Sequence, residues 1–153
     1  MSIKKELDEI KKMSLEGFND VEHLEKLLNY IVNNGDNSQI INICCALDDK
    51  IKHPSVGEDL VKAIFYIAEE HGLEEGMFEV AKSMPSMIPH GKEWATIINR
   101  MILDSDELIE LYKDSIRKVD NSTQLIIYDI LEYLKEDDFE YSKIVDELIL
   151  ECF

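Results

Sequence analysis

Residues 55–84 read SVGEDLVKAIFYIAEEHGLEEGMFEVAKSM, and this segment predicts a hairpin of two α-helices. In its first half, apolar residues recur three and four positions apart, as they do on the buried face of a helix. These residues are Leu60, Ile64, Ile67 and Ala68. Ser55 and Glu58 fit the spacing of a capping box, which marks the start of a helix. Gly72 is expected to end the first helix, and Pro85 the second, shorter one.

The same helical periodicity continues on both sides of this hairpin. Apolar stripes lie within residues 3–10, 21–31, 40–47, 94–102, 108–119, 125–134 and 144–149. The stripe of residues 125–134 covers more than one narrow face, so we expect its helix to be the most buried. The chain holds only six Gly and three Pro, which favours long helices with short connections.

The helices are expected to fall into pairs. The pairs begin near Asp20, Ser55, Gly91 and Asn121, about 30 to 36 residues apart, which is the period of two-helix repeats. We therefore predict an all-α fold of about eight or nine helices, stacked as antiparallel hairpins in a HEAT-like short solenoid. A plain helical bundle is the alternative. The length and the 45% hydrophobic content fit a single helical domain spanning residues 1–153.

The charge of the chain is its main indication of function. Its 33 Asp and Glu outnumber its 16 Lys and Arg, which gives a formal net charge of −17. So negative a surface repels nucleic acid and anionic membranes and attracts cationic proteins over a long range. The N-terminus has no apolar signal core, and no apolar run is long enough to span a membrane. We therefore expect a cytoplasmic protein whose partner is basic.

No pattern of residues indicates catalysis, a metal or a cofactor. Cys44, Cys45 and Cys152 lack the spacing of zinc or redox motifs, and the adjacent pair is expected at or near the core. The four histidines lie far apart in the sequence, with no metal-binding spacing between them. The serines and the histidine of residues 83–91 lack any sign of the orienting and oxyanion groups that a nucleophile needs. We therefore predict a protein that is not an enzyme and that uses no cofactor.

The last third of the chain is the candidate partner-binding surface. Residues 104–153 hold 15 acidic and 5 basic side chains, and tyrosines lie among the acids. Tyrosine is favoured at interface centres because it is large, rather rigid and amphipathic, and the carboxylates around it would pair with Lys or Arg of a partner. The alternative is that these tyrosines are core residues. The candidate residues are Glu110, Asp114, Asp129, Glu132, Tyr133, Asp137, Asp138, Glu140 and Tyr141.

Residues 89–102, PHGKEWATIINRMI, resemble a known family. The loop and the Trp-Ala-x-Ile-Ile-Asn-Arg stretch of residues 94–100 are similar to those of immunity protein 30, a group of small helical proteins. These are encoded beside bacterial polymorphic or contact-dependent growth inhibition toxins. The resemblance implies an antitoxin that binds one cognate toxin, without a cofactor and without catalytic residues. Because nucleases act on a polyanion and are themselves basic, an acidic antitoxin fits a nuclease toxin.

Three other functions remain open at this stage. The chain could be a helical-repeat scaffold or adaptor that docks a basic peptide. It could be a metal-dependent helical hydrolase, although the ligand spacings expected on facing helices are missing. It could also imitate DNA with a regular line of carboxylates. In each binding function the chain is expected to be a monomer or a weak dimer, with no affinity for nucleic acid or membranes.

Overall fold

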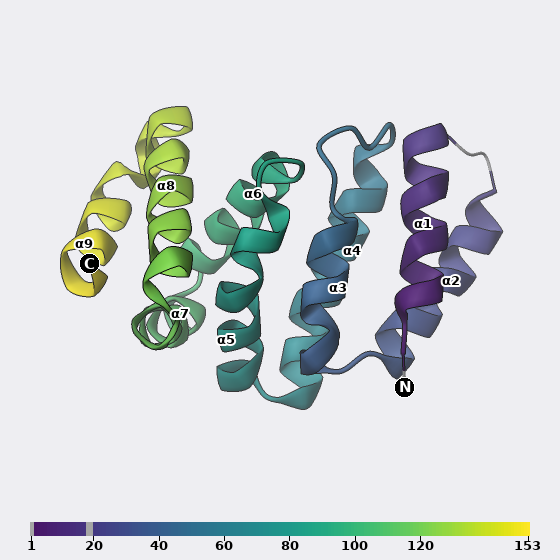
Figure 1. Ribbon diagram of the computed structural model, residues 1–153, viewed down its shortest axis with the longest axis horizontal. Coiled ribbons are helices and arrows are strands. Elements are labelled where there is room, and N and C mark those ends of the chain that lie inside the picture. The colour runs from purple at the N-terminus through teal and green to yellow at the C-terminus, as the bar shows by residue number, and fades with distance from the viewer. Residues whose placement is uncertain (1, 18–19) are drawn as a thin grey trace.

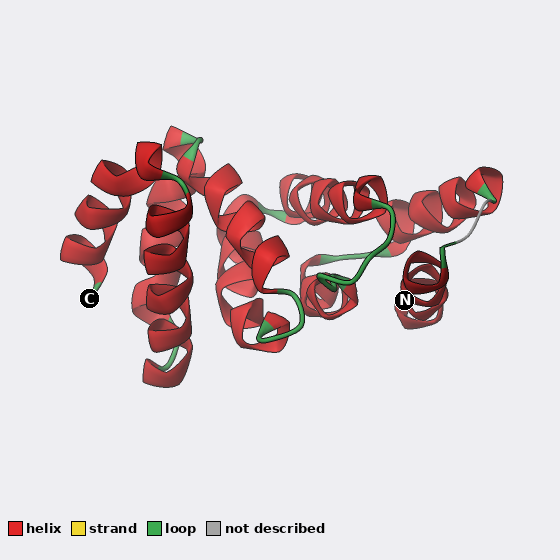
Figure 2. Ribbon diagram, turned by 90° about the horizontal axis from the view of Figure 1, so that it is seen from above, coloured by secondary structure: helices red, strands yellow, loops and turns green. Residues whose placement is uncertain are grey.

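The computed structural model describes residues 2–17 and 20–153, and every regular element in these ranges is a helix (Figure 2). The α-helices are α1 Lys4–Glu16, α2 Val21–Asn34, α3 Ile40–Ala46, α4 Pro54–His71, α5 Leu73–Ser83, α6 Lys92–Leu103, α7 Asp106–Lys118, α8 Asn121–Asp137 and α9 Ser142–Cys152. The 3-10 helices are η1 Asn37–Gln39, η2 Met84–Met87 and η3 Phe139–Tyr141. The prediction of an all-α fold with eight or nine helices is confirmed.

The helices form an elongated stack with the two chain ends at opposite ends of it (Figure 1). Each odd-numbered helix packs against the next odd-numbered one, from α1 through α3, α5 and α7 to α9. The even-numbered helices pack as α2 on α4 and α6 on α8. The hairpin predicted from residues 55–84 is present, because α4 packs closely on α5. At the N-terminal end, α2 packs on α1 and α4, so the first hairpin is α1–α2 and not the expected pair that begins near Asp20.

One hydrophobic cluster of buried side chains runs through the stack, from Ile3 in front of α1 to Leu148 in α9. Tyr112 of α7 is the largest fully buried side chain. Trp94 at the start of α6 is also buried, and its indole Nε1 donates a hydrogen bond of 3.0 Å to the carbonyl oxygen of Asp48. Adjacent helices are thus joined mainly by apolar burial, which is the dominant stabilising contribution in such a fold.

Side-chain caps fix the starts of several helices, although not the one that the capping-box pattern predicts. Asp20 accepts a hydrogen bond from the backbone N–H of His23, and Ser105 accepts one from Leu108. The prediction that Ser55 caps a helix is wrong, because α4 begins at Pro54 and no side chain caps it. Proline suits the first position of a helix because its φ is already helical and its missing N–H would have no partner there. Ser55 therefore lies inside the first turn.

Two expectations about burial are wrong. α8 is not the most buried helix, because Leu125 on it is 66% exposed, whereas α4 buries eight residues. α8 lies near the end of the stack, and only one of its faces meets the core. Of the two adjacent thiols, Cys44 is buried but Cys45 is exposed. Consecutive helical positions point in different directions, so they seldom share one environment.

Candidate functional site

Four of the predicted partner-binding residues belong to a connected group of contacts near Arg100 of α6, which we call the α6–α8 cluster. Its members are Asp137, Asp138, Glu140 and Tyr141, together with Arg100 and Asp104. Arg100 Nη2 lies 3.5 Å from Asp137 Oδ2, and its Nε lies 3.9 Å from Asp138 Oδ2. The guanidinium carbon lies 5.7 Å from the centre of the Tyr141 ring. Arg100 thus neutralises part of the charge of Asp137 and Asp138, whereas Glu140 joins the cluster through its backbone N–H, which donates to Asp138 Oδ1.

Tyr141 is fixed within this cluster by a second contact. Its hydroxyl donates a hydrogen bond of 2.8 Å to Asp104 Oδ1. Burial, together with this carboxylate, raises the pKa of Tyr141 to about 12. The phenol therefore stays protonated at neutral pH and acts as a donor.

Tyr133 lies one turn before this cluster, on the side of α8 that faces the start of α6. Its hydroxyl donates to the Glu93 carboxylate, which raises the pKa of Tyr133. Lys92 Nζ lies 4.1 Å from the ring centre, within the range of a cation–π interaction. The Asp49 carboxylate in turn accepts a hydrogen bond of 3.1 Å from the backbone N–H of Glu93. These contacts hold the tyrosine ring half-buried between α6 and α8, with part of it accessible to a partner.

Glu110 and Asp114 lie apart from the α6–α8 cluster, on α7. Figure 1 places α7 at the opposite end of α8 from η3. Lys113 Nζ lies 3.1 Å from Glu110 and 2.9 Å from Glu151 of α9, and Arg117 lies 3.1 Å from Asp114. The predicted surface is therefore divided into two areas, and in both of them local cations pair with the acids.

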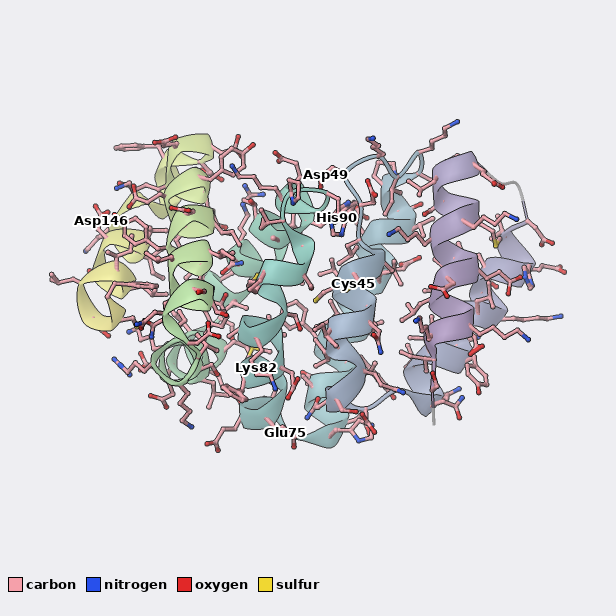
Figure 3. All side chains as sticks on the ribbon, viewed as in Figure 1. Cys45, Asp49, Glu75, Lys82, His90 and Asp146 are labelled. Atoms are coloured by element: carbon pink, nitrogen blue, oxygen red, sulfur yellow. The ribbon has the colours of Figure 1, made fainter. Side chains whose placement is uncertain are left out.

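The other predicted acids, Asp129 and Glu132, lie on α8. Glu132 lies 3.6 Å from Lys135, which also donates a hydrogen bond of 2.9 Å to Asp146 on α9. Figure 3 shows Asp146 at the outer edge of the stack. Asp129 is exposed, like Glu140 in η3. Counting formal charges could not reveal how many of these acids have a basic neighbour, because those neighbours come from other helices.

A groove lies between α2 and α4, at a place where no binding site was expected from the sequence. It consists of two adjoining hollows of about 450 and 350 Å³ that share Glu25, Leu28 and Asp59. On the α2 side its lining is Val21, Leu24, Glu25, Leu28, Asn29 and Val32. On the α4 side it is His53, Ser55, Val56, Asp59, Lys62, Ala63 and Tyr66. We call this feature the α2–α4 groove.

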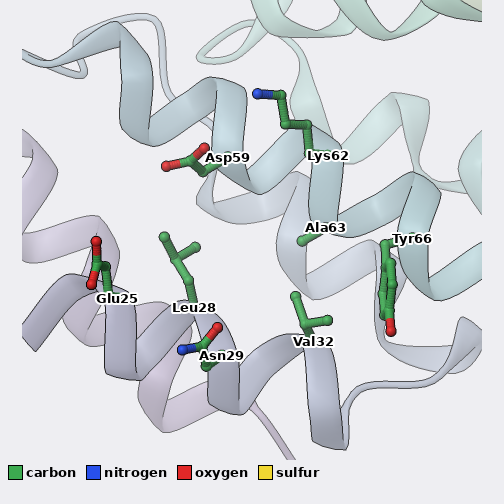
Figure 4. Close-up of a pocket in the computed structure, with 8 residues that line it drawn as sticks. All are labelled: Glu25, Leu28, Asn29, Val32, Asp59, Lys62, Ala63 and Tyr66. Carbon is green, nitrogen blue, oxygen red and sulfur yellow. The ribbon is translucent and has the colours of Figure 1, made fainter.

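The α2–α4 groove has an apolar middle and an acidic end. Figure 4 shows Leu28 and Val32 pointing towards α4, where Ala63 leaves room between the helices. Tyr66 bounds the groove at one end, and the carboxylates of Glu25 and Asp59 lie towards the other. Among the described residues neither of these two carboxylates forms an ion pair. The groove can therefore take an apolar group that carries a positive charge beside it.

One sequence signal could have indicated the groove. The apolar stripe of α2 is wider than its core face, because Val21, Leu28 and Val32 extend it beyond the buried Leu24 and Leu27. On α4, the small residue Ala63 is followed one turn later by an exposed Tyr66. An apolar stripe wider than the core needs, opposite a small residue, is typical of a groove between helices. Periodicity alone assigns all these positions to the core.

Metal-binding and membrane-spanning features are absent from the part of the chain that the structure describes. No three His, Cys, Asp or Glu side chains within residues 2–17 and 20–153 are arranged to hold a metal ion. No helix in these ranges has both the length and the hydropathy to cross a bilayer.

Comparison with known proteins identifies the family. The model of the family described as Immunity protein 30 matches residues 10–112, which is more than half of the chain. The match includes both helices of the α2–α4 groove, and of the predicted partner-binding residues it includes only Glu110. Neither the curated proteins nor the solved structures gave a match. The matched region contains the Trp94–Arg100 stretch on which the resemblance was based, and this chain belongs to the Immunity protein 30 family.

Proposed function

We propose that this chain is a cytoplasmic immunity protein that binds and neutralises a cognate, basic toxin domain such as a nuclease. Membership of the Immunity protein 30 family is the observation that carries the proposal. The net charge of −17 supports a basic partner, because opposite charges speed the encounter of two proteins and disfavour wrong partners. Neutralisation in this proposal is binding without chemistry: the antitoxin covers the active site of the toxin or the path of its substrate.

The exposed residues of the α6–α8 cluster and of α8 have a role in steering the toxin. Asp129 and Glu140 are exposed, and Tyr133 and Tyr141 are held half-buried by hydrogen bonds to carboxylates. Charges at the rim of an interface act mainly on the association rate. Substituting both exposed acids by Lys is therefore expected to slow association more than it speeds dissociation.

A pull-down and a growth assay test the proposed function. The bait is this chain, and the prey is the toxin domain encoded by the adjacent upstream gene. We expect the two proteins to copurify, and we expect co-expression of this chain to restore growth of cells that produce the toxin. The association rate should fall as salt is raised, because screening shortens the range of the attraction. If the toxin neither binds this chain nor is neutralised by it, the proposal is wrong. If the association rate did not depend on salt, the proposal that electrostatic attraction steers the toxin would be wrong.

A further inference from the structure

The α2–α4 groove leaves apolar side chains accessible at a place where both helices already have their core contacts. α2 packs on α1, and α4 packs on α3 and α5. Yet Val21 is 62% exposed and Tyr66 is 45% exposed. A groove that exposes apolar side chains beside unpaired carboxylates is a typical place for a partner to bind.

The charges along this groove differ from those of the C-terminal helices. Asp137 and Asp138 of the α6–α8 cluster share Arg100, and Glu110 and Asp114 of α7 pair with Lys113 and Arg117. In contrast, Glu25 and Asp59 line both hollows and form no ion pair among the described residues, and Lys62, which lines the larger hollow, pairs with neither of them. Their negative potential is thus available to a positively charged group that enters the groove.

The length of the groove sets the size of its occupant. Its lining on α2 runs from Val21 to Val32, and a helix rises about 1.5 Å per residue, so the groove is about 16 Å long. That length corresponds to about three turns of an α-helix. Helices laid in grooves are recognised through apolar residues one turn apart, and the spacing of Leu28, Val32 and Tyr66 along the groove offers several such contacts.

We propose that the α2–α4 groove binds an amphipathic α-helix of the cognate toxin, which rests on the proposed function above. The apolar face of that helix lies on Leu28, Val32 and Tyr66, and its flanking Lys or Arg side chains pair with Glu25 and Asp59. A second copy of this chain is disfavoured as the occupant, because each copy carries a net charge of −17 and would be repelled. The groove anchors the toxin and slows its release, while the α6–α8 cluster steers its approach.

Matched charge reversals test this proposal. The groove variant is Glu25→Lys with Asp59→Lys. The control is Glu22→Lys with Glu58→Lys, which alters the same two helices by the same total charge at exposed positions that do not line the groove. A third variant, Tyr66→Ala, removes an apolar contact without changing charge. Binding to the purified upstream toxin domain is measured by surface plasmon resonance, and folding by circular dichroism.

The expected results separate the groove from the general charge of the protein. The groove double variant should weaken affinity by about tenfold or more relative to the control double variant. Tyr66→Ala should also weaken affinity by about tenfold, mainly through faster dissociation. The two double variants should melt at about the same temperature as each other, because both make the same change of charge outside the core, and Tyr66→Ala should melt close to the wild-type protein.

Each contrary result has its own meaning. If the wild-type chain binds the toxin and the groove variants bind as the control does, the groove proposal is wrong while the proposed function stands. If the wild-type chain does not bind the toxin at all, both are wrong. If the isolated chain sediments as a dimer that Tyr66→Ala converts to a monomer, the occupant is a second copy and the proposal is overturned.

Discussion

Tyr112 and Asn99 form a buried polar contact in the middle of the apolar stack. The Tyr112 hydroxyl donates a hydrogen bond of 2.7 Å to Asn99 Oδ1, and Asn99 Nδ2 donates one of 2.7 Å to the carbonyl oxygen of Ala95. Both side chains are fully buried. For the tyrosines of residues 104–153 the sequence left an interface and a core role open, and the structure makes Tyr112 a core residue that joins α7 to α6. The hydrogen bond is what allows two polar groups to be buried at this point.

Substitution of Tyr112 by Phe is expected to destabilise the protein. The change leaves Asn99 Oδ1 buried without its donor, which costs about 1–3 kcal/mol of unfolding free energy. Urea denaturation followed by circular dichroism measures the change. The control is Tyr133→Phe, whose hydroxyl bonds to the exposed Glu93 and whose loss should leave the stability close to that of the wild-type protein. Equal losses in the two variants would contradict this assignment.

Stability is expected to fall at alkaline pH. Burial raises the pKa of the Cys44 thiol from its ordinary 9.0 to about 12, and burial also raises the pKa of Tyr112. In the unfolded chain both groups lose their protons at their ordinary pKa, so a rising pH favours unfolding. This contribution is complete below pH about 9 and is lost as the pH rises towards 12. One such group changes the stability by at most about 1.4 kcal/mol per pH unit.

Urea denaturation between about pH 8 and about pH 10.5 tests this dependence. The variant Cys44→Ala should show a shallower decline than the wild-type protein, even if its stability is lower at neutral pH. Cys45→Ala is the control, because that thiol is exposed and next to Cys44 in the sequence. A decline that is as steep in Cys44→Ala as in the control would contradict the assignment to the buried thiol.

The start of α7 shows how a helix boundary depends on a single side chain. Ser105 has an extended backbone, and its hydroxyl accepts a hydrogen bond of 3.2 Å from the backbone N–H of Leu108. The first turn also contains Asp106 and Glu107, whose charges favour the positive end of the helix dipole. α7 packs on α5, α6 and α9, so fraying of its first turn loosens several neighbours.

Substitution of Ser105 by Ala is expected to lower the unfolding free energy by about 1 kcal/mol, because one N–H at the helix start loses its partner. The matched control is Ser55→Ala, at a serine that has the sequence pattern of a cap but does not act as one. That change should stay within about 0.5 kcal/mol of the wild-type protein. Thermal melts of the two variants measure both effects. If Ser55→Ala lowered the unfolding free energy more than Ser105→Ala did, Ser55 would cap α4 after all.

The helices could be predicted from the sequence more reliably than the site. Periodicity placed the stripes of α2, α4, α6 and α7 because the 3.6-residue repeat is local. The capping-box pattern failed at Ser55, because Pro54 takes the first position of the helix, and periodicity failed at Leu125, whose exposure depends on its place near the end of the stack. The pairing of Arg100 with Asp137 and Asp138 joins residues about 40 positions apart, and no local rule contains that information.

At the scale of the whole molecule, the charges repel one another. The net charge is −17, and the nine ion pairs that Lys and Arg form among the described residues relieve only part of the repulsion. Self-repulsion destabilises a compact state, and salt screens it. The α2–α4 groove is also a property of the whole molecule, because it depends on how α2 and α4 pack against each other. The periodicity of each helix by itself does not predict that packing.

The melting temperature of the isolated chain is expected to rise with salt. The screening length shortens from about 30 Å at 0.01 M to about 8 Å at 0.15 M salt. Repulsion between distant charges therefore weakens before the attraction within close ion pairs does. Each kcal/mol gained raises the melting temperature by about 2–4 °C for a chain of this size. Differential scanning calorimetry in NaCl measures the shift. A melting temperature that falls on addition of salt would mean that the ion pairs outweigh the repulsion.

The packing of Gly57 under Trp94 gives the molecule a built-in optical reporter. A Cβ on Gly57 would lie 2.2 Å from Trp94 Cζ2, so glycine is what lets α4 approach the indole. Trp94 is the single tryptophan of the chain, and it touches α4 and the segment after α3 at once. Its fluorescence therefore comes from one known place in the middle of the stack. Separation of α6 from α4 would shift the emission to the red, even while the outer helices remained folded.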